Sequence, residues 1–296
     1  MVLESIVSGI TVRKHPLVMM FLAAVLSSIG IWTSYYIFPS SASILSIAFI
    51  TIGIVPILYT IFILEEAEEA SEGGSWPGFI SRHFDIVKIY SWFFIGLILS
   101  YSLWYVVLPN EVRTNVFAEQ NNVIGQISEL RTELTGNITG NALGSPFVCE
   151  KNLWCWFDVI LQNNLRVLFL AVILSLVYGV GAMFLIAWNA SVIGAYIGQD
   201  ALIVLGSYAG FGHFAPVLAY CHGLINAFGL IPHGIFEVTG YFVGAIAGAL
   251  ISIVVTKGKY RKNEVSLLVK DTIGLVFLAV ILLVIGALIE AALIVG

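Results

Sequence analysis

Apolar stretches of span length dominate this sequence. Crossing the hydrocarbon core of a bilayer as a helix takes about 20 apolar residues. The clearest candidates are Pro16–Phe38, Ala42–Leu64, Val87–Leu108, Arg166–Trp188, Pro232–Thr256 and Thr272–Val295. Only 10% of the residues are charged, whereas a soluble domain has about 25%. The sequence therefore predicts an all-α polytopic membrane protein and excludes a water-soluble enzyme or a disordered chain.

The basic residues predict how the chain sits in the membrane. Five of the 13 Lys and Arg residues fall in the short segment Lys257–Lys270. Because loops rich in Lys and Arg stay in the cytoplasm, we expect this segment and the N-terminus to be cytoplasmic. The loop 109–162 is then extracytoplasmic, and we expect a multi-pass protein of the cell membrane.

The middle of the chain is less regular than the other apolar stretches. Between Asn189 and Ile231 the sequence is interrupted by Gly206, Gly210, Gly212 and Pro216. Two crossings here would place the basic segment outside, whereas one crossing keeps it inside. We therefore expect about seven spans and one re-entrant or broken segment near Asn189–Gly210. Irregular backbone is tolerated at membrane depth where protein buries it or where it lines a cavity, so this segment indicates a site.

We expect three regions along the chain. Residues 1–108 form a three-span region with an acidic cytoplasmic loop that begins at Glu65. We interpret this loop as a solvated helix end. The alternative is that it binds a cation or docks a partner. Residues 109–162 form the extracytoplasmic loop, and residues 163–296 form a polar membrane core.

The extracytoplasmic loop carries two local patterns. One is an apolar series at helical spacing, which predicts a short amphipathic helix: Val116, Val123, Ile127, Leu130 and Leu134. The other is a pair of nearby cysteines, Cys149 and Cys155. Outside the cytoplasm such a pair is more often a small disulfide than a metal site, and free thiols are the alternative. Residues 137–139 also match a short glycosylation sequon.

Acidic residues within the apolar sequence give the strongest indication of function. Asp200, Glu237 and Glu290 lie there, whereas every Lys and Arg falls in a loop or at the end of an expected span. An ionised carboxylate in hydrocarbon is costly and usually faces a bundle interior or a cavity. His233 precedes Glu237 by one helical turn, so both lie on one helix face. This pattern predicts a proton or cation site around His233 and Glu237. The alternative is structural: His233 caps the turn, and Glu237 forms a hydrogen bond to a neighbouring helix.

Other polar and small residues extend this prediction. Asn164, Asn189 and Asp200 are further candidates for the polar core. The glycines at positions 240, 244 and 248 follow Glu237 and lie four residues apart, a spacing that is typical of a face packed closely against another helix. Such a face is also compatible with a homodimer.

Three stretches resemble the stage II sporulation protein M family: residues 160–164, residues 189–194 and the run Pro232-His233-Gly234 with Glu237. The resemblance covers about Phe157–Val255 and implies that Asn164, Asn189, His233 and Glu237 are characteristic polar positions. It also implies a membrane scaffold without catalysis of its own that gathers envelope-associated proteins.

Two functions remain after these observations. The polar residues favour a permeation or transport protein, and the resemblance favours a scaffold. No phosphate-binding loop, zinc-protease or hydrolase motif is present, so we expect no enzyme, no cofactor and no metal site. A membrane-embedded hydrolase using His233 and Glu237 lacks a nucleophile at recognisable spacing. A net charge of −5 argues against nucleic acid as a partner, which leaves the lipid bilayer and other proteins.

Overall fold

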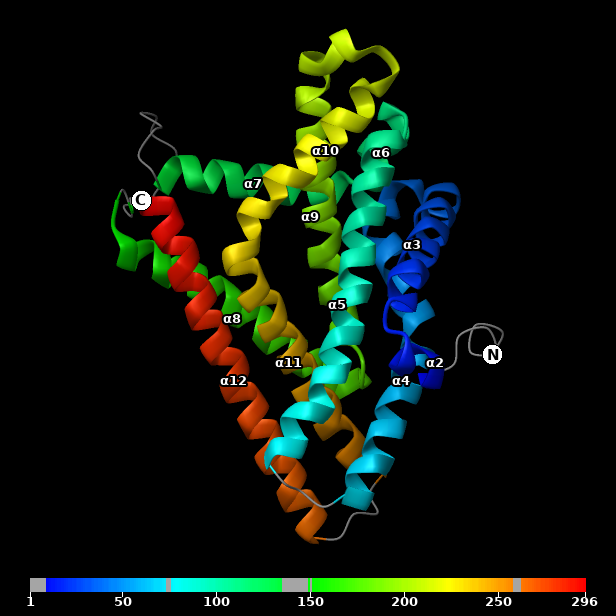
Figure 1. Ribbon diagram of the computed structural model, residues 1–296, viewed down its shortest axis with the longest axis vertical. Coiled ribbons are helices and arrows are strands. Elements are labelled where there is room, and N and C mark those ends of the chain that lie inside the picture. Colours follow the sequence, from blue (N-terminus) through cyan, green and yellow to red (C-terminus); the bar gives the residue numbers. More distant parts are fainter. Residues whose placement is uncertain (1–8, 73–75, 135–148, 150, 258–261) are drawn as a thin grey trace.

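The computed structural model describes residues 9–72, 76–134, 149, 151–257 and 262–296, and all regular elements in these ranges are helical (Figure 1). This confirms the predicted all-α class. Six helical stretches of the described residues are long and apolar enough to cross a membrane. They are Val18–Ile37, Pro39–Ile63, Phe84–Val107, Leu153–Tyr178, Ala182–Ser252 and Val269–Val295. The sequon at 137–139 lies outside the described residues.

The first group of helices comes mainly from the N-terminal part of the chain. It consists of α2 (Gly9–Lys14), α3 (Val18–Ile37), α4 (Ala42–Glu72), α5 (Trp76–Val107) and, from later in the chain, α9 (Ala182–Val204). The short turn η1 (Pro39–Ser41) connects α3 to α4. Small residues allow close approach: Gly194 of α9 lies against Tyr101 of α5, and Gly198 lies against Tyr105.

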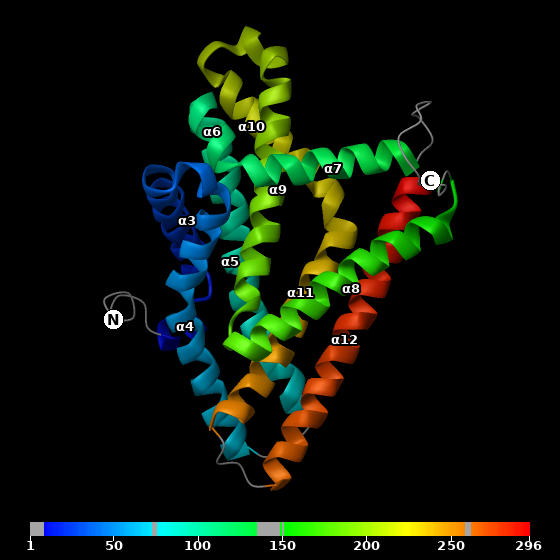
Figure 2. The same ribbon diagram turned by 180° about the vertical axis from the view of Figure 1, so that it is seen from behind.

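The second group contains α8 (Leu153–Tyr178), α11 (Ile231–Lys257) and α12 (Lys262–Val295). Each of the three contacts the other two, and both views show α8 crossing α12 beside α11 (Figure 2). Phe242 of α11 packs edge-on against Tyr90 and Phe94 of α5, which joins the two groups.

The irregular part of the chain lies later than the sequence predicts. Helix α9 runs without interruption to Val204, so a break near Asn189–Gly210 is wrong for residues 189–204. The chain then passes through η2 (Leu205–Phe214), α10 (Ala215–Ala227) and η3 (Phe228–Leu230) into α11. Gly212 supplies the backbone kink in η2, with a φ of 57° that glycine adopts without steric cost.

The expected span Arg166–Trp188 is also wrong, because the chain reverses within it. Helix α8 begins at Leu153 and ends at Tyr178, and Gly179 follows with a φ of 73°. Asn152 fixes the start of α8, because its side chain accepts hydrogen bonds from the backbone N–H groups of Trp154 and Cys155. The predicted loop 109–162 therefore includes the first turns of α8.

The described residues between α5 and α8 form two helices. They are α6 (Asn110–Val116) and α7 (Ala118–Leu134), and α7 runs across α9 in both views. Gln120 of α7 is fully buried and donates from Nε2 to Ser191 Oγ of α9 at 3.1 Å. The predicted helix is confirmed, although Val116 belongs to α6 rather than to α7 and Ile127 of the predicted apolar face is exposed.

Candidate functional site

Two side-chain hydrogen bonds join α8 and α11 directly. Asn164 donates from Nδ2 to Oε1 of Glu237 at 2.7 Å, and Tyr241 donates from its hydroxyl to Oδ1 of Asn164 at 2.9 Å. Asn164 and Tyr241 are buried. Because a hydrogen bond to an ionisable group in a low-dielectric interior is strong, this chain of two bonds holds α8 and α11 together at this point.

Helix α12 completes this arrangement. Glu290 lies near enough to interact electrostatically with both Glu237 and Tyr241. One turn earlier, Gly286 faces α11, and a Cβ atom at this position would lie 2.8 Å from Cγ of Glu237 and 3.3 Å from the carbonyl oxygen of His233. We call Asn164, Glu237, Tyr241 and Glu290 the carboxyl cluster. His233 is buried beside it, one turn before Glu237.

The three predicted glycines of α11 allow close packing, but they face two different helices, α8 and α12, instead of one. Gly240 faces α12, where a Cβ atom would lie 3.0 Å from Cδ2 of Leu283. Gly244 and Gly248 face α8, with Gly248 against the backbone of Val172. The structure therefore covers all three glycines within one chain, and the homodimer stays a prediction that these faces do not support.

Two of the predicted polar residues lie elsewhere. Asn189 donates from Nδ2 to the carbonyl oxygen of Leu185, one turn earlier in α9. Asp200 of α9 accepts a hydrogen bond from Asn226 of α10 at 2.8 Å. Of the predicted set, the structure thus gathers Asn164, His233 and Glu237, while Asn189 and Asp200 belong to the α9–α10 side of the molecule.

Sequence reasoning missed Tyr241 and Gly286. Tyr241 follows Glu237 at four-residue spacing, and this was a usable signal, because the two residues share a helix face. Gly286 gave no such signal, since its role depends on where α12 meets α11.

The expectation that basic residues stay in loops or at span ends is wrong for Arg166. This residue lies inside α8, because that helix starts earlier than expected. Its side chain is exposed, two positions after the buried Asn164, so the two residues point to different faces of the helix.

A disulfide joins Cys149 to Cys155, with 5.4 Å between the Cα atoms. Cys149 is buried with Trp156 and with Ala291 of α12. The bond therefore fixes the start of α8 against the C-terminal end of α12, at one end of the helix pair that carries Asn164 and Glu290. Among the described residues, no group of three or more His, Cys, Asp or Glu side chains is arranged to hold a metal ion.

Comparison with known proteins gives one family and one relative. The sequence model of the family described as "Stage II sporulation protein M" matches residues 90–293, a range that contains the whole carboxyl cluster. An uncharacterised protein of Methanocaldococcus jannaschii is 33% identical over 137 residues, which covers 45% of this chain and 68% of the relative. No solved structure matches the chain.

Proposed function

The chain belongs to the stage II sporulation protein M family, and we propose that it is a non-enzymatic membrane protein whose carboxyl cluster binds a proton or small cation on a permeation pathway. The observation that supports this proposal is that Glu290 lies one turn after Gly286, the residue of α12 that faces Glu237, on apolar helices of span length. Two carboxyl groups in such surroundings need a proton, a cation or hydrogen-bond donors to balance their charge.

The hydrogen bond that Glu237 accepts from Asn164 suits a site that binds a proton or cation reversibly. Asn164 occupies Oε1 of Glu237 with a neutral amide donor. Tyr241 holds Asn164 by its amide oxygen, so the orientation of this amide is fixed and its nitrogen faces the carboxylate. A neutral donor stabilises a carboxylate without neutralising it, which leaves the charge available to a proton or cation.

Flux into proteoliposomes tests this proposal. The purified protein is reconstituted and compared with Glu237→Gln for flux of protons, Na⁺ and K⁺ under imposed gradients. Glutamine keeps an oxygen that can accept the hydrogen bond from Asn164 and removes only the charge. We expect flux with the native protein and a fall to the level of protein-free liposomes with the variant.

Asp200→Asn is the matched control, because Asp200 is an acid of the same apolar region that bonds to Asn226 instead of to the cluster. Flux should persist in this variant. The permeation proposal fails if the native protein conducts none of these ions, or if both variants conduct as the native protein does.

A scaffold is the second candidate, and the tight packing around Glu237 favours it. The missing side chain of Gly286 lets α12 lie directly against Glu237, so the cluster could serve only to hold three helices together. A scaffold would recruit envelope-associated proteins through its exposed surfaces. It requires no flux for any ion, and it requires Glu237→Gln to lower the melting temperature of the purified protein.

A further inference from the structure

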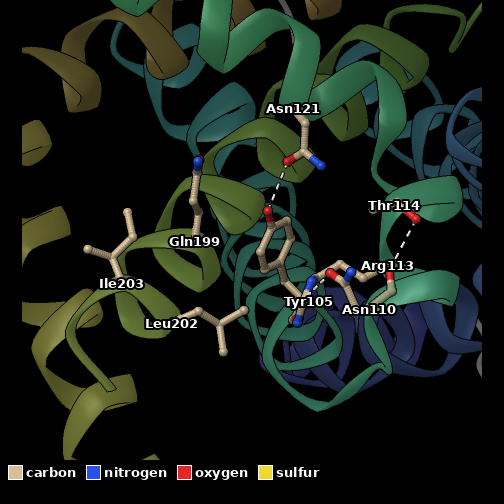
Figure 3. A pocket seen from close by; sticks show the side chains of 8 residues that line it. All are labelled: Tyr105, Asn110, Arg113, Thr114, Asn121, Gln199, Leu202 and Ile203. Atoms are coloured by element: carbon tan, nitrogen blue, oxygen red, sulfur yellow. Dashed lines mark hydrogen bonds between the residues drawn. The ribbon is translucent and has the colours of Figure 1, made fainter. Parts of the chain in front are cut away.

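A polar cavity of about 300 Å³ opens between α5, α6, α7 and α9 (Figure 3). None of these helices contributes to the carboxyl cluster. The lining residues are Tyr105, Asn110, Arg113, Thr114, Asn121, Gln199, Leu202 and Ile203. Ligand pockets in proteins start at about this volume, so the cavity can hold a small polar group.

Arg113 supplies a fixed positive charge to this cavity. Its Nη1 donates to the carbonyl oxygens of Tyr105 at 3.3 Å and Leu108 at 3.5 Å, which lie at the end of α5. Its Nη2 donates to Oδ1 of Asn110 at 2.9 Å, and its guanidinium carbon lies 5.5 Å from the centre of the Tyr105 ring. All these acceptors are uncharged, and none of the eight lining residues is acidic. The charge is therefore positioned but not neutralised by the walls of the cavity.

The amide side chains leave donors free for a ligand. Oδ1 of Asn110 already accepts from Arg113, and Oδ1 of Asn121 accepts from the Tyr105 hydroxyl at 3.0 Å. What remains on each asparagine is its NH₂ group. Arg113 also has donors beyond the three bonds described above, because a guanidinium carries five N–H groups. A cavity with a cation and spare N–H donors fits a ligand that only accepts hydrogen bonds and carries negative charge.

One wall of the cavity is apolar and open. Leu202 and Ile203 of α9 form this wall, and the Ile203 side chain is 72% exposed. Figure 3 shows these two side chains across the cavity from Arg113 and Asn110. Donors on one side and exposed aliphatic carbon on the other suit a charged group that is attached to a hydrocarbon chain.

We propose that this cavity binds a phosphate group, with Arg113 as the charge partner and Asn110 and Asn121 as amide donors. The phosphate comes either from the headgroup of an anionic lipid or from a free phosphate anion. The recognition chemistry is the same for both sources.

Binding to the purified full-length protein in detergent tests the proposal in two arms. In the first arm, native mass spectrometry compares phosphatidylglycerol with diacylglycerol of the same acyl chains, which lacks the phosphate. In the second arm, inorganic phosphate is compared with chloride by the shift in melting temperature. Retention of phosphatidylglycerol over diacylglycerol identifies the lipid source, and a shift caused by phosphate alone identifies the free anion.

Two substitutions place the binding at this cavity. Arg113→Gln removes the charge, and Asn121→Asp keeps the oxygen that accepts from Tyr105 but exchanges the amide donor for a carboxylate. Each should weaken phosphate-dependent binding by at least about tenfold, as expected for loss of a hydrogen bond to a charged group. Lys88→Gln is the control, because Lys88 is an exposed cation of α5 that pairs with Asp85 instead of lining the cavity.

Asn121→Asp carries the test by itself if Arg113→Gln does not fold, because Arg113 also bonds the last carbonyl groups of α5. The proposal is overturned if the native protein binds neither phosphatidylglycerol nor phosphate above the matched controls. It is equally overturned if folded Asn121→Asp binds as tightly as the native protein.

Discussion

Glu237 contacts two neighbouring helices, α8 and α12. Each contact depends on the type of residue that the neighbouring helix places there. On α8, Asn164 donates a hydrogen bond from its amide. On α12, Gly286 has no side chain and so leaves room for Glu237. The first contact is polar and the second is steric, so they can be tested separately.

The steric contact is tested by Gly286→Ala. The added Cβ atom would lie 2.8 Å from Cγ of Glu237, closer than carbon atoms normally approach, so α11 or α12 must shift. Overpacking of this kind costs about 1–3 kcal/mol. We expect a lower melting temperature in detergent than that of the native protein.

Gly274→Ala is the matched control on the same helix. Nothing lies within 4 Å of a Cβ atom at this position, so alanine should leave stability unchanged or raise it by up to about 1 kcal/mol through helix propensity. In a Glu237→Ala background, which removes Cγ, Gly286→Ala should cost less than it does alone. Equal melting temperatures for the two glycine variants would show that α12 does not pack as described.

At the scale of single residues, the sequence identifies the polar residues of the cluster but not which of them meet across different helices. His233 and Glu237 were placed on one face correctly, because both lie on one helix and helical spacing is a local property. Whether Asn164 or Asn189 meets Glu237 depends on which helix packs beside α11, and that is decided by the glycines at 244 and 248 facing α8. The functional role of these residues stays a prediction.

At the scale of elements, the existence of helices was easier to predict than their limits. The last turns of α8 and the first turns of α9 are apolar, so a hydropathy window crosses the turn between them without a drop. The signals that end α8 are local: Asn152 caps its first turn, and Gly179 adopts a positive φ after its last residue. The break predicted near Asn189–Gly210 falls too early, because Gly194 and Gly198 serve helix packing instead of interrupting α9.

The disulfide at the start of α8 gives an expectation about this element. Cys149 and Cys155 are separated by six positions, and closing so small a loop stabilises a protein by about 2 kcal/mol. We expect Cys155→Ser, or reduction of the native protein, to lower the melting temperature by a corresponding amount. The loss should concern the contact of α8 with the end of α12, because Cys149 packs against Ala291.

Cys221→Ser serves as the comparison for this experiment, since Cys221 is an exposed free cysteine of α10. It should melt as the native protein does, and its melting temperature should still fall on reduction. A native protein with the same melting temperature in oxidising and reducing buffer would contradict a stabilising role of the bond.

On the scale of the whole molecule, two sites lie on different groups of helices. The carboxyl cluster belongs to α8, α11 and α12, and the Arg113 cavity belongs to α5, α6, α7 and α9. Variants in one site should therefore leave the other intact, which makes the flux and binding experiments independent of each other. Figure 1 shows α6 far from the last turns of α4 and α11, so the cavity lies toward one end of the molecule.

The basic residues predict the direction in which the molecule crosses the membrane. The ends of α4 and α11 lie together at the end opposite α6 and η2, in both views. The segment Lys257–Lys270 adjoins the end of α11, and its five basic residues should hold this side in the cytoplasm. We expect α6 and α7, and with them the Arg113 cavity, to face outward.

Cysteine labelling measures this direction. In a Cys221→Ser background, Gln126→Cys reports on α7 and Lys88→Cys reports on the first half of α5, because both native side chains are exposed. A membrane-impermeant maleimide added to intact cells should label Gln126→Cys and spare Lys88→Cys, and inverted vesicles should give the reverse. The opposite pattern would place the basic segment outside, against the rule that sets orientation. The phosphate in the Arg113 cavity would then come from the cytoplasmic side.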